Sequence, residues 1–452
     1  MRPAFLERNA KSSADAPAIC AAGETISHGE LDRLVAHYNL SLGAAGVFPG
    51  QVVLLEGDFS VDGIAGFLAL IERDTVIVPL AGAAAARRRE LVETVQAEVT
   101  VRVARGDLVV QRRAHRATHP LYDEIRRRGS AGLVLLSSGS SGNPKAAVHD
   151  LAPLLARFEK PRPPLTAVSF LAFDHIGGVN TLFSILSRTG CLVVPEERSP
   201  DGVLAAVAEH AVQLLPVSPT FMNLVLLSEA WRRHDCRSLE TVTYGTEPMP
   251  ETTLRRFHET FPGVKLQQMY GLSEVGILGS RSRAADSTWM SIGGSGFDVR
   301  IVEGKLEIKA ETQMLGYLNA PSPFTADGWM RTDDAVEVDG EWIRVLGRAS
   351  ELINVAGKKV WPAEIENVVH ECEAVIEATA WGEPNPITGQ AVCVRVRPRA
   401  ACDERKFARD IRRHCRQRLE AYKVPVRVIV DERAQHGPRF KKLRVPVAGG
   451  VG

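Results

Sequence analysis

The chain has 452 residues, of which 45% are hydrophobic and 24% charged, and its formal net charge is +1. This composition is typical of a folded globular protein with two or more domains, and it excludes a chain that is disordered, collagen-like or coiled-coil throughout. The small net charge gives no reason to expect a nucleic-acid partner. The sequence contains no apolar run of the ~18 residues that a membrane-spanning helix requires.

The seven cysteines lie far apart, from Cys20 to Cys415, and no two have CxxC spacing. This pattern predicts neither a zinc site nor a disulfide framework, and it favours a reducing compartment. Residues 1–20 lack the apolar core and small-residue cleavage site of a secretory signal. We therefore expect a cytoplasmic protein.

Residues 1–130 alternate between helical and strand patterns. Ser27 and Glu30 form a capping-box signature ahead of an amphipathic helix that runs to about Leu42. A strand, a helix and a second strand are then predicted at 52–55, 64–71 and 76–79. Strand, helix and strand at this spacing indicate a parallel sheet built from βαβ units. Further buried strands are predicted at 134–136, 191–194, 212–216 and 242–244.

The pattern changes after Gly293. Short alternating segments at 299–302, 306–309, 335–338 and 342–345 flank turns and predict antiparallel strands. A small α+β segment follows from Ala349, with a helix that starts at Pro362. The predicted fold class is therefore α/β: a large N-terminal domain, residues 1–348, with mixed and parallel sheets and a small antiparallel β subdomain, and a small α+β C-terminal domain, residues 349–452.

Positive charge is concentrated in the C-terminal domain, where residues 349–452 hold 19 Lys and Arg against 13 Asp and Glu. Such a surplus attracts an anionic partner, or it reflects a solvated charged helix around residues 405–418.

The strongest local motif follows the apolar run 133–136. It consists of Ser137, Ser138, Gly139, Ser140, Ser141 and Gly142, and it ends at Lys145. Small residues let the backbone approach a ligand closely, so that N–H groups, hydroxyls and the lysine hold phosphate oxygens. It is not a Walker A loop, because GxxxxGK[ST] is absent. Taken alone, the motif is equally well explained as a flexible Ser/Gly linker.

Further motifs follow in order along the chain. They are Tyr244-Gly-Thr-Glu-Pro248, Tyr270-Gly-Leu-Ser-Glu274, Gly328-Trp-Met-Arg-Thr-Asp-Asp334, the segment 346–366, Tyr422-Lys-Val-Pro425 and Phe440-Lys-Lys-Leu-Arg444. In this order and spacing they resemble the adenylate-forming superfamily, which includes acyl- and aryl-CoA ligases and adenylation domains. The resemblance covers essentially the whole chain, and the segment 347–366 is its most specific part.

The resemblance implies a two-step reaction. A small-molecule carboxylic acid attacks the α-phosphate of ATP, with Mg²⁺ present, to give an acyl-adenylate and pyrophosphate. The thiol of CoA, or of a phosphopantetheinyl carrier protein, then displaces AMP. Such chemistry depends on positioning and on neutralising phosphate charge.

The resemblance also implies roles for individual residues. The loop from Ser137 to Lys145 holds the β- and γ-phosphates, and Glu274 helps to hold Mg²⁺. Tyr270 stacks on the adenine, with Gly271 beside it, and Ser273 reaches the α-phosphate. Asp334 and Arg348 bind the ribose, and Asp333 stands where the family usually has Gly. The loop Tyr244, Gly245, Thr246 and Glu247 lines the adenine and the acyl pocket. For each of these residues alone, a turn or a surface charge is the alternative explanation.

In the acyl pocket, His175 matches a gate beside the acyl carboxylate, although it is also explained as a core histidine. Asp174 either caps the helix that follows, which is the interpretation we favour, or meets a substrate amino group. Ser350 falls at the hinge of the mobile C-terminal domain, and Gly357 lies beside the thiol tunnel. Lys441 is expected to be the lysine of the adenylation step, with Lys442 as the alternative, unless both are solvated cations of the tail.

The predicted function is therefore an AMP-forming acid–thiol ligase. The alternatives are an enzyme that adenylates an amino acid or another oxyanion, and a nucleotide-binding protein without turnover.

Overall fold

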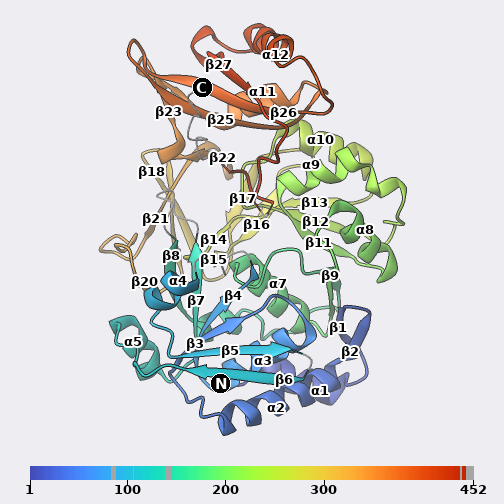
Figure 1. The fold of residues 1–452 in the computed structure, drawn as a ribbon, viewed down its shortest axis with the longest axis vertical. Coiled ribbons are helices and arrows are strands. Elements are labelled where there is room, and N and C mark those ends of the chain that lie inside the picture. Colours follow the sequence, from blue (N-terminus) through green and yellow to red (C-terminus); the bar gives the residue numbers. More distant parts are fainter. Residues whose placement is uncertain (83–87, 105, 138–143, 438–439, 444–452) are drawn as a thin grey trace.

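The computed structural model describes residues 1–82, 88–104, 106–137, 144–437 and 440–443, and the side chain of Ser137 is not described. The predicted α/β fold class is confirmed: three sheets and their helices form a large N-terminal body, and a smaller C-terminal domain stacks on one end of it (Figure 1). The boundary predicted after Arg348 stays a prediction; the residues that follow it form the short 3-10 helix η3, Ala349–Glu351. None of the helices in the described ranges is long and apolar enough to cross a lipid bilayer.

The first sheet has seven strands in the order β13-β12-β11-β9-β10-β1-β2, and all of its pairings are parallel except the one between β1 and β2. Its strands are β1 (Pro17–Ala21), β2 (Glu24–Ser27), β9 (Thr166–Val168), β10 (Cys191–Val194), β11 (Leu214–Val217), β12 (Thr241–Tyr244) and β13 (Lys265–Gln268). The strand predicted at 212–216 starts two residues later than expected, because Val212 still belongs to the turn that follows a helix.

The second sheet also has seven strands, in the order β20-β8-β7-β4-β3-β5-β6. They are β3 (Val52–Glu56), β4 (Val76–Leu80), β5 (Val99–Ala104), β6 (Asp107–Arg112), β7 (Gly132–Ser137), β8 (Lys145–Asp150) and β20 (Gly316–Tyr317). β3, β4, β5 and β7 are parallel, as the βαβ spacing predicted. β7 and β8 pair antiparallel, so the predicted phosphate loop connects two adjacent strands; residues 138–143 lie outside the described residues.

The helices of the N-terminal body pack on these sheets. They are α1 (Ala4–Ser12), α2 (His28–Ala44), α3 (Val61–Glu72), α4 (Arg88–Thr94), α5 (Pro120–Arg128), α6 (Leu151–Ala156), α7 (Ile176–Leu186), α8 (Pro200–Glu209), α9 (Pro219–Ser228) and α10 (Glu251–Thr260). The predicted capping box is confirmed at α2: the Glu30 N–H donates to Ser27 Oγ (3.2 Å), and the Ser27 N–H donates to Glu30 Oε2 (2.8 Å).

The third sheet is antiparallel, in the order β16-β17-β22-β21-β19-β18, as predicted for the segment after Gly293. Its strands are β16 (Gly279–Ser282), β17 (Met290–Gly293), β18 (Phe297–Val302), β19 (Lys305–Ala310), β21 (Met330–Asp339) and β22 (Trp342–Arg348). A small hairpin, β14 (Gly271–Leu272) and β15 (Gly276–Ile277), lies between the sheets.

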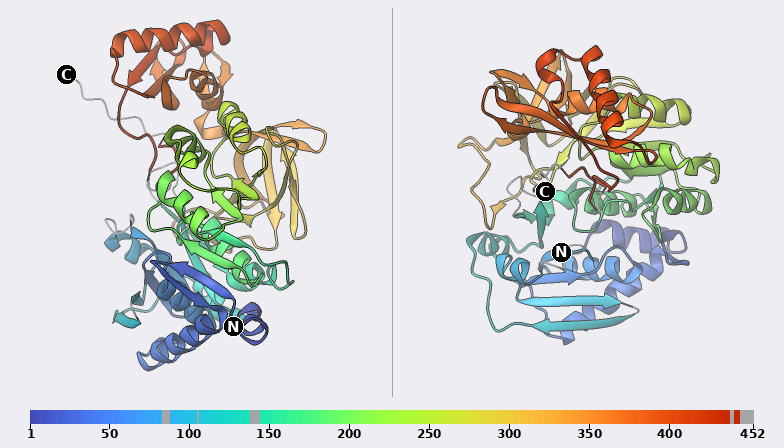
Figure 2. Two further views of the ribbon diagram at one scale, coloured as in Figure 1. Left: turned by 90° about the vertical axis from the view of Figure 1, so that its right-hand side faces the viewer. Right: turned by 45° about the horizontal axis from the view of Figure 1, so that its top comes forward.

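The C-terminal domain has its own sheet and two helices, which stack at one end of the molecule (Figure 2). The sheet contains β23 (Ile353–Val355), β24 (Lys358–Val360), β25 (Val375–Asn385), β26 (Gly389–Pro398) and β27 (Arg427–Val430). The helices are α11 (Pro362–His370) and α12 (Glu404–Arg418). α12 is largely exposed and buries only Ile411 and Cys415, so the basic segment is a solvated helix.

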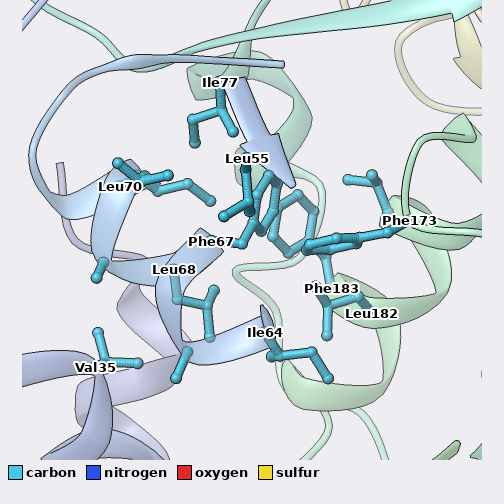
Figure 3. Close-up of a cluster of buried hydrophobic side chains, with 14 of the residues drawn as sticks. Val35, Leu55, Ile64, Phe67, Leu68, Leu70, Ile77, Phe173, Leu182 and Phe183 are labelled. Carbon is cyan, nitrogen blue, oxygen red and sulfur yellow. The ribbon is translucent and has the colours of Figure 1, made fainter. Parts of the chain in front are cut away.

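An aromatic cluster in the main core lies between α3 and α7 (Figure 3). The Phe173 ring packs against those of Phe59 and Phe67, with centroids 4.6 and 4.7 Å apart, and Phe183 stacks near Phe67. Phe173 belongs to the loop after β9, which carries Asp174 and His175. Burying this ring therefore fixes the path of the loop that reaches the predicted acyl pocket.

Candidate active site

Two of the motifs predicted to contact a nucleotide lie at the carboxyl edge of the parallel strands of the first sheet. Tyr244 ends β12, and Tyr270 follows β13 by two residues. Ser218, which no sequence motif indicated, follows β11 at the same edge. In parallel α/β sheets, ligands bind beyond this edge, because the loops that leave adjacent strands converge there. The topology thus brings Ser218 and Tyr270, which are 52 positions apart in the sequence, to the same edge of the sheet.

Asp334 lies at the centre of one group of polar side chains. The Tyr270 hydroxyl donates to Asp334 Oδ2 (2.5 Å), and the Arg348 Nε lies 3.7 Å from Asp334 Oδ1. Asp334 and Arg348 are paired residues of β21 and β22. Burial raises the pKa of Asp334, which is 6% exposed, while the Tyr270 hydroxyl and the Arg348 charge lower it. The structure therefore joins three predicted nucleotide contacts into one buried acceptor site.

Asp333 adopts a left-handed backbone conformation, with φ = +60°. Glycine is the residue best suited to this region, and aspartate is among the few others that tolerate it. Its side chain is exposed and lies 3.4 Å from Lys305. The substitution thus keeps the backbone conformation that positions the neighbouring Asp334.

A second group surrounds Glu274. The Tyr317 hydroxyl donates to Glu274 Oε1 (2.5 Å), and Lys145 Nζ lies 5.3 Å from the centroid of the Tyr317 ring. Tyr317 lies on β20, which pairs with β8 beside the predicted phosphate loop. Sequence motifs did not indicate Tyr317, because only this long-range strand pairing brings it to Glu274. The half-buried carboxylate fits Mg²⁺, which proteins commonly bind through one or two carboxylates together with substrate phosphates.

The loop after β12 is held in a tight conformation. A Cβ at Gly245 would lie 2.6 Å from the Met269 carbonyl oxygen, so only glycine fits there, and Thr246 has φ = +76°. Tyr244 is almost fully buried in the core beneath this loop. Glu247 binds two other segments: its Oε1 accepts from the Thr220 N–H (2.8 Å), and its Oε2 accepts from the Lys442 N–H (3.0 Å).

His175, not Asp174, caps α7, so the cap predicted for Asp174 is wrong. The Gly177 N–H donates to His175 Nδ1 (3.0 Å), and His175 is the N-cap residue. Because Nδ1 accepts this bond, Nε2 carries the proton of the neutral imidazole. Asp174 is buried, at 3% exposed. The Phe173 ring orients the loop so that His175, two residues after it, reaches the end of α7.

The two candidate lysines have different surroundings. Lys442 Nζ lies 2.8 Å from Glu366 Oε2 within the C-terminal domain. The charged groups that act on Lys441 are Arg348, Glu247, Glu351 and Asp334. Surrounding protein atoms, which displace water from the ammonium group, and the positive charge of Arg348 lower the pKa of Lys441. The residue as a whole is still exposed. The charges of Arg348 and Asp334 therefore act on Lys441, whereas Lys442 forms its ion pair within the C-terminal domain.

Ser350 lies in the connection between β22 and β23, within η3. Gly357 lies at the exposed tip of the β23–β24 hairpin, with φ = +81°, next to Ala356 at φ = +51°. A Cβ at Gly357 would meet no atom within 4 Å, so only the backbone conformation disfavours a side chain there. The tip is thus available to approach another surface.

We expect Gly357→Asn to leave adenylate formation unchanged and to slow thioester formation by ~10-fold or more, about 1.4 kcal/mol of barrier. Asparagine tolerates positive φ, so the hairpin should persist while its side chain obstructs the thiol path. Pyrophosphate exchange measures the first step, and conversion of a supplied acyl-adenylate measures the second. Ala356→Asn is the matched control. An equal loss in both steps would assign Gly357 to folding instead.

His149 lies fully buried on β8, near the backbone of Ser273 and Thr312. Burial disfavours the imidazolium and lowers its pKa from 6.5 to about 4. Below pH 6.5 the unfolded chain binds this proton and the folded chain does not, so the folded state loses stability until the pH nears 4.

His149→Gln removes this titration. Between pH 7 and 4.5 both proteins should lose free energy of unfolding. We expect the loss to be about 2 kcal/mol smaller in His149→Gln than in the wild type. Urea unfolding at several pH values measures both slopes. Parallel curves for the two proteins would mean that His149 titrates normally in the folded state.

Comparison with known proteins gives matches along most of the chain. A model of the family described as AMP-binding enzyme matches residues 6–328, and one described as AMP-binding enzyme C-terminal domain matches residues 364–436. The feruloyl-CoA synthase of an Amycolatopsis species is 26% identical over 94% of each chain. The indoleacetate–CoA ligase of Aromatoleum aromaticum is 28% identical over 59% of this chain and 57% of its own.

Solved structures share the fold. An anthranilate CoA ligase in complex with anthranoyl-AMP aligns with a TM-score of 0.81 at 18% identity, covering 97% of this chain and 94% of the other. An o-succinylbenzoate CoA synthetase from Bacillus subtilis, in complex with ATP and magnesium, aligns with a TM-score of 0.77 at 19% identity over 98% of each chain.

Proposed function

Because the chain belongs to the AMP-binding enzyme family and is an AMP-forming acid–thiol ligase, we propose that it activates an aryl or acyl carboxylic acid with ATP and Mg²⁺ and transfers the acyl group to CoA. The observation that carries the proposal is the convergence of Tyr270, Asp334, Arg348 and Lys441 at the carboxyl edge of the first sheet. The aromatic acids named for two similar ligases, ferulate and indoleacetate, favour an aryl substrate.

Each polar group has a separate task in this proposal. Asp334 accepts hydrogen bonds from the ribose, and Arg348 adds a donor beside it. Glu274, supported by Tyr317, holds Mg²⁺ near the phosphates, and Mg²⁺ supplies neutralisation of phosphate charge when bound. Lys441 stabilises the negative charge that shifts between the acid and the α-phosphate. His175 lies beside the acyl carboxylate and donates from Nε2.

The hinge at Ser350 and the hairpin tip at Gly357 serve the second step. In this proposal the C-terminal domain turns at Ser350 after adenylation, and Gly357 then lines the path of the thiol. We propose CoA as the acceptor in place of a carrier protein, because the similar ligases are named for CoA. The free thiols of all seven cysteines suit the cytoplasm as its location.

An amino-acid substrate is the second candidate, and the buried carboxylate of Asp174 is the observation that favours it. A substrate ammonium group would pair with this charge. Such an enzyme would prefer an amino acid over the corresponding acid without the amino group.

The experiment is acid-dependent ATP–pyrophosphate exchange with aryl, fatty and amino acids, followed by thioester formation with CoA or a carrier protein. We expect exchange with an aryl or fatty acid and product with CoA. Asp174→Asn should leave that exchange intact. Selective exchange with an amino acid, lost in Asp174→Asn, would favour the second candidate. Tight ATP binding without exchange for any acid would indicate a nucleotide-binding protein without turnover.

A further inference from the structure

Phe440 leaves the C-terminal domain and inserts its ring into the N-terminal body. Residues 440–443, here called the C-terminal strap, run beside α9 (dark red in Figure 1). The Phe440 ring centroid lies 5.5 Å from that of Phe170 and 5.2 Å from that of Phe221. Phe170 lies in the loop after β9, and Phe221 in the first turn of α9. The ring of His436 stacks on the same phenylalanine at 5.3 Å.

The backbone of Phe440 is held in an unfavourable conformation, with φ = +50°. A bulky residue rarely adopts this region, and it persists there only where its surroundings fix it. The aromatic contacts provide this constraint. The conformation also sets the direction in which the chain continues to Lys441.

Hydrogen bonds hold the strap on both sides of Lys441. Ser218 Oγ donates to the Phe440 carbonyl oxygen (2.6 Å), and the Lys442 N–H donates to Glu247 Oε2 (3.0 Å). Ser218 is also the N-cap of α9, and Glu247 also accepts from Thr220. Both anchors therefore belong to elements at the carboxyl edge of the first sheet, so they fix the backbone on both sides of Lys441, on which the charges of Arg348 and Asp334 act.

We propose that Phe440 is a positioning residue for adenylation: its ring, seated against Phe170 and Phe221, holds Lys441 in the nucleotide site. The proposal rests on the two-step function proposed above. The second half-reaction requires the Phe440 ring to leave its contacts with Phe170 and Phe221, because the C-terminal domain has to turn first. Phe440 thus favours the first half-reaction over the second.

Phe440→Gly tests this inference, since glycine accepts the positive φ of this position and removes the aromatic side chain. We expect the kcat for adenylation to fall ~10–100-fold, as for loss of the contacts of a half-buried aromatic ring. The KM for ATP should change little, because Tyr270 and Asp334 are untouched. Conversion of a supplied acyl-adenylate should proceed at the wild-type rate or faster. Phe440→Tyr keeps the ring and should restore adenylation.

Leu443→Ala is the matched control, because Leu443 lies on the same strap but is 48% exposed. Its adenylation rate should equal that of the wild type. Adenylation by Phe440→Gly at the wild-type rate, or equal loss of both steps, would overturn the proposal.

A second readout does not depend on the substrate. Trypsin cleaves after Lys441 and Lys442, and intact-mass measurement follows the loss of the terminal fragment. We expect ~10-fold faster cleavage in Phe440→Gly than in the wild type, because cleavage reports the unseated population. An equal cleavage rate in Phe440→Gly and the wild type would contradict the proposed role of the Phe440 ring, independently of the reaction that the protein catalyses. If Phe440→Gly is cleaved faster but the wild type shows no acid-dependent exchange, the aromatic contacts of Phe440 are supported and the proposed function is rejected.

Discussion

Lys441→Ala is expected to slow adenylate formation by ~10²–10³-fold while leaving conversion of a supplied acyl-adenylate to thioester nearly intact. The physical reason is a preorganised charge: an ammonium group held beside the reacting phosphate stabilises charge that develops only in the first transition state. The charged groups that act on Lys441 are those of the nucleotide site, above all Arg348. Pyrophosphate exchange and single-turnover thioester formation measure the two steps separately.

Lys442→Met is the matched comparison and should behave differently. Its ammonium pairs with Glu366, which is 3% exposed and whose Oε1 also accepts from the Ala380 N–H. Removing one partner leaves a buried carboxylate without its cation, which costs about 3 kcal/mol of folding free energy. We therefore expect a lower thermal midpoint with both half-reactions affected alike. A selective adenylation defect in Lys442→Met, with none in Lys441→Ala, would reverse the assignment.

The local elements were predictable because their signals lie within a few residues. Ser27 and Glu30 cap α2 as expected, and the apolar runs 52–55 and 76–79 became buried parallel strands. The family was predictable as well, since several motifs occur in a fixed order, and the match over residues 6–328 confirms it. The prediction of an AMP-forming acid–thiol ligase is confirmed with it.

Side-chain direction was harder to predict. Asp174 and His175 are adjacent and both are able to cap a helix, and the buried ring of Phe173 decides between them. Lys441 and Lys442 are likewise adjacent. The sequence indicated only that neighbouring side chains on an extended chain point to opposite sides. Their directions follow from Phe440, whose positive φ and aromatic seat no local pattern indicates. The role of Lys441 stays a prediction.

Contacts across long sequence separations could not be predicted. Tyr317 reaches Glu274 because β20 pairs with β8. In this pairing Tyr317 lies opposite Ala147, which is 170 residues earlier in the sequence. Glu247 was expected to line a pocket, but its carboxylate also binds α9 and the C-terminal strap. Tyr317 lies outside every sequence motif, and Glu247 lies within one but makes additional contacts. Both sets of contacts depend on the tertiary structure, so the sequence alone did not predict them.

Asp334→Ala should weaken ATP binding by ~10–100-fold, because charge-assisted hydrogen bonds to the ribose contribute ~1.5–3 kcal/mol. The protein should stay folded, since the change removes a buried charge together with its need for partners. Calorimetric titration with ATP measures the affinity, and circular dichroism checks the fold. Unchanged affinity in a folded Asp334→Ala protein rules out this assignment.

The Tyr270 hydroxyl gives the same site a pH signature. Burial raises the pKa of Asp334, and the hydrogen bond from Tyr270 counteracts this shift. Binding through the carboxylate is present above that pKa and is lost as the pH falls through it. Tyr270→Phe keeps the ring but removes the donor, so the pKa of Asp334 rises further and the acid limb of ATP affinity moves to higher pH. If the limb of Tyr270→Phe coincides with that of the wild type, Asp334 is not the group that binds the ribose.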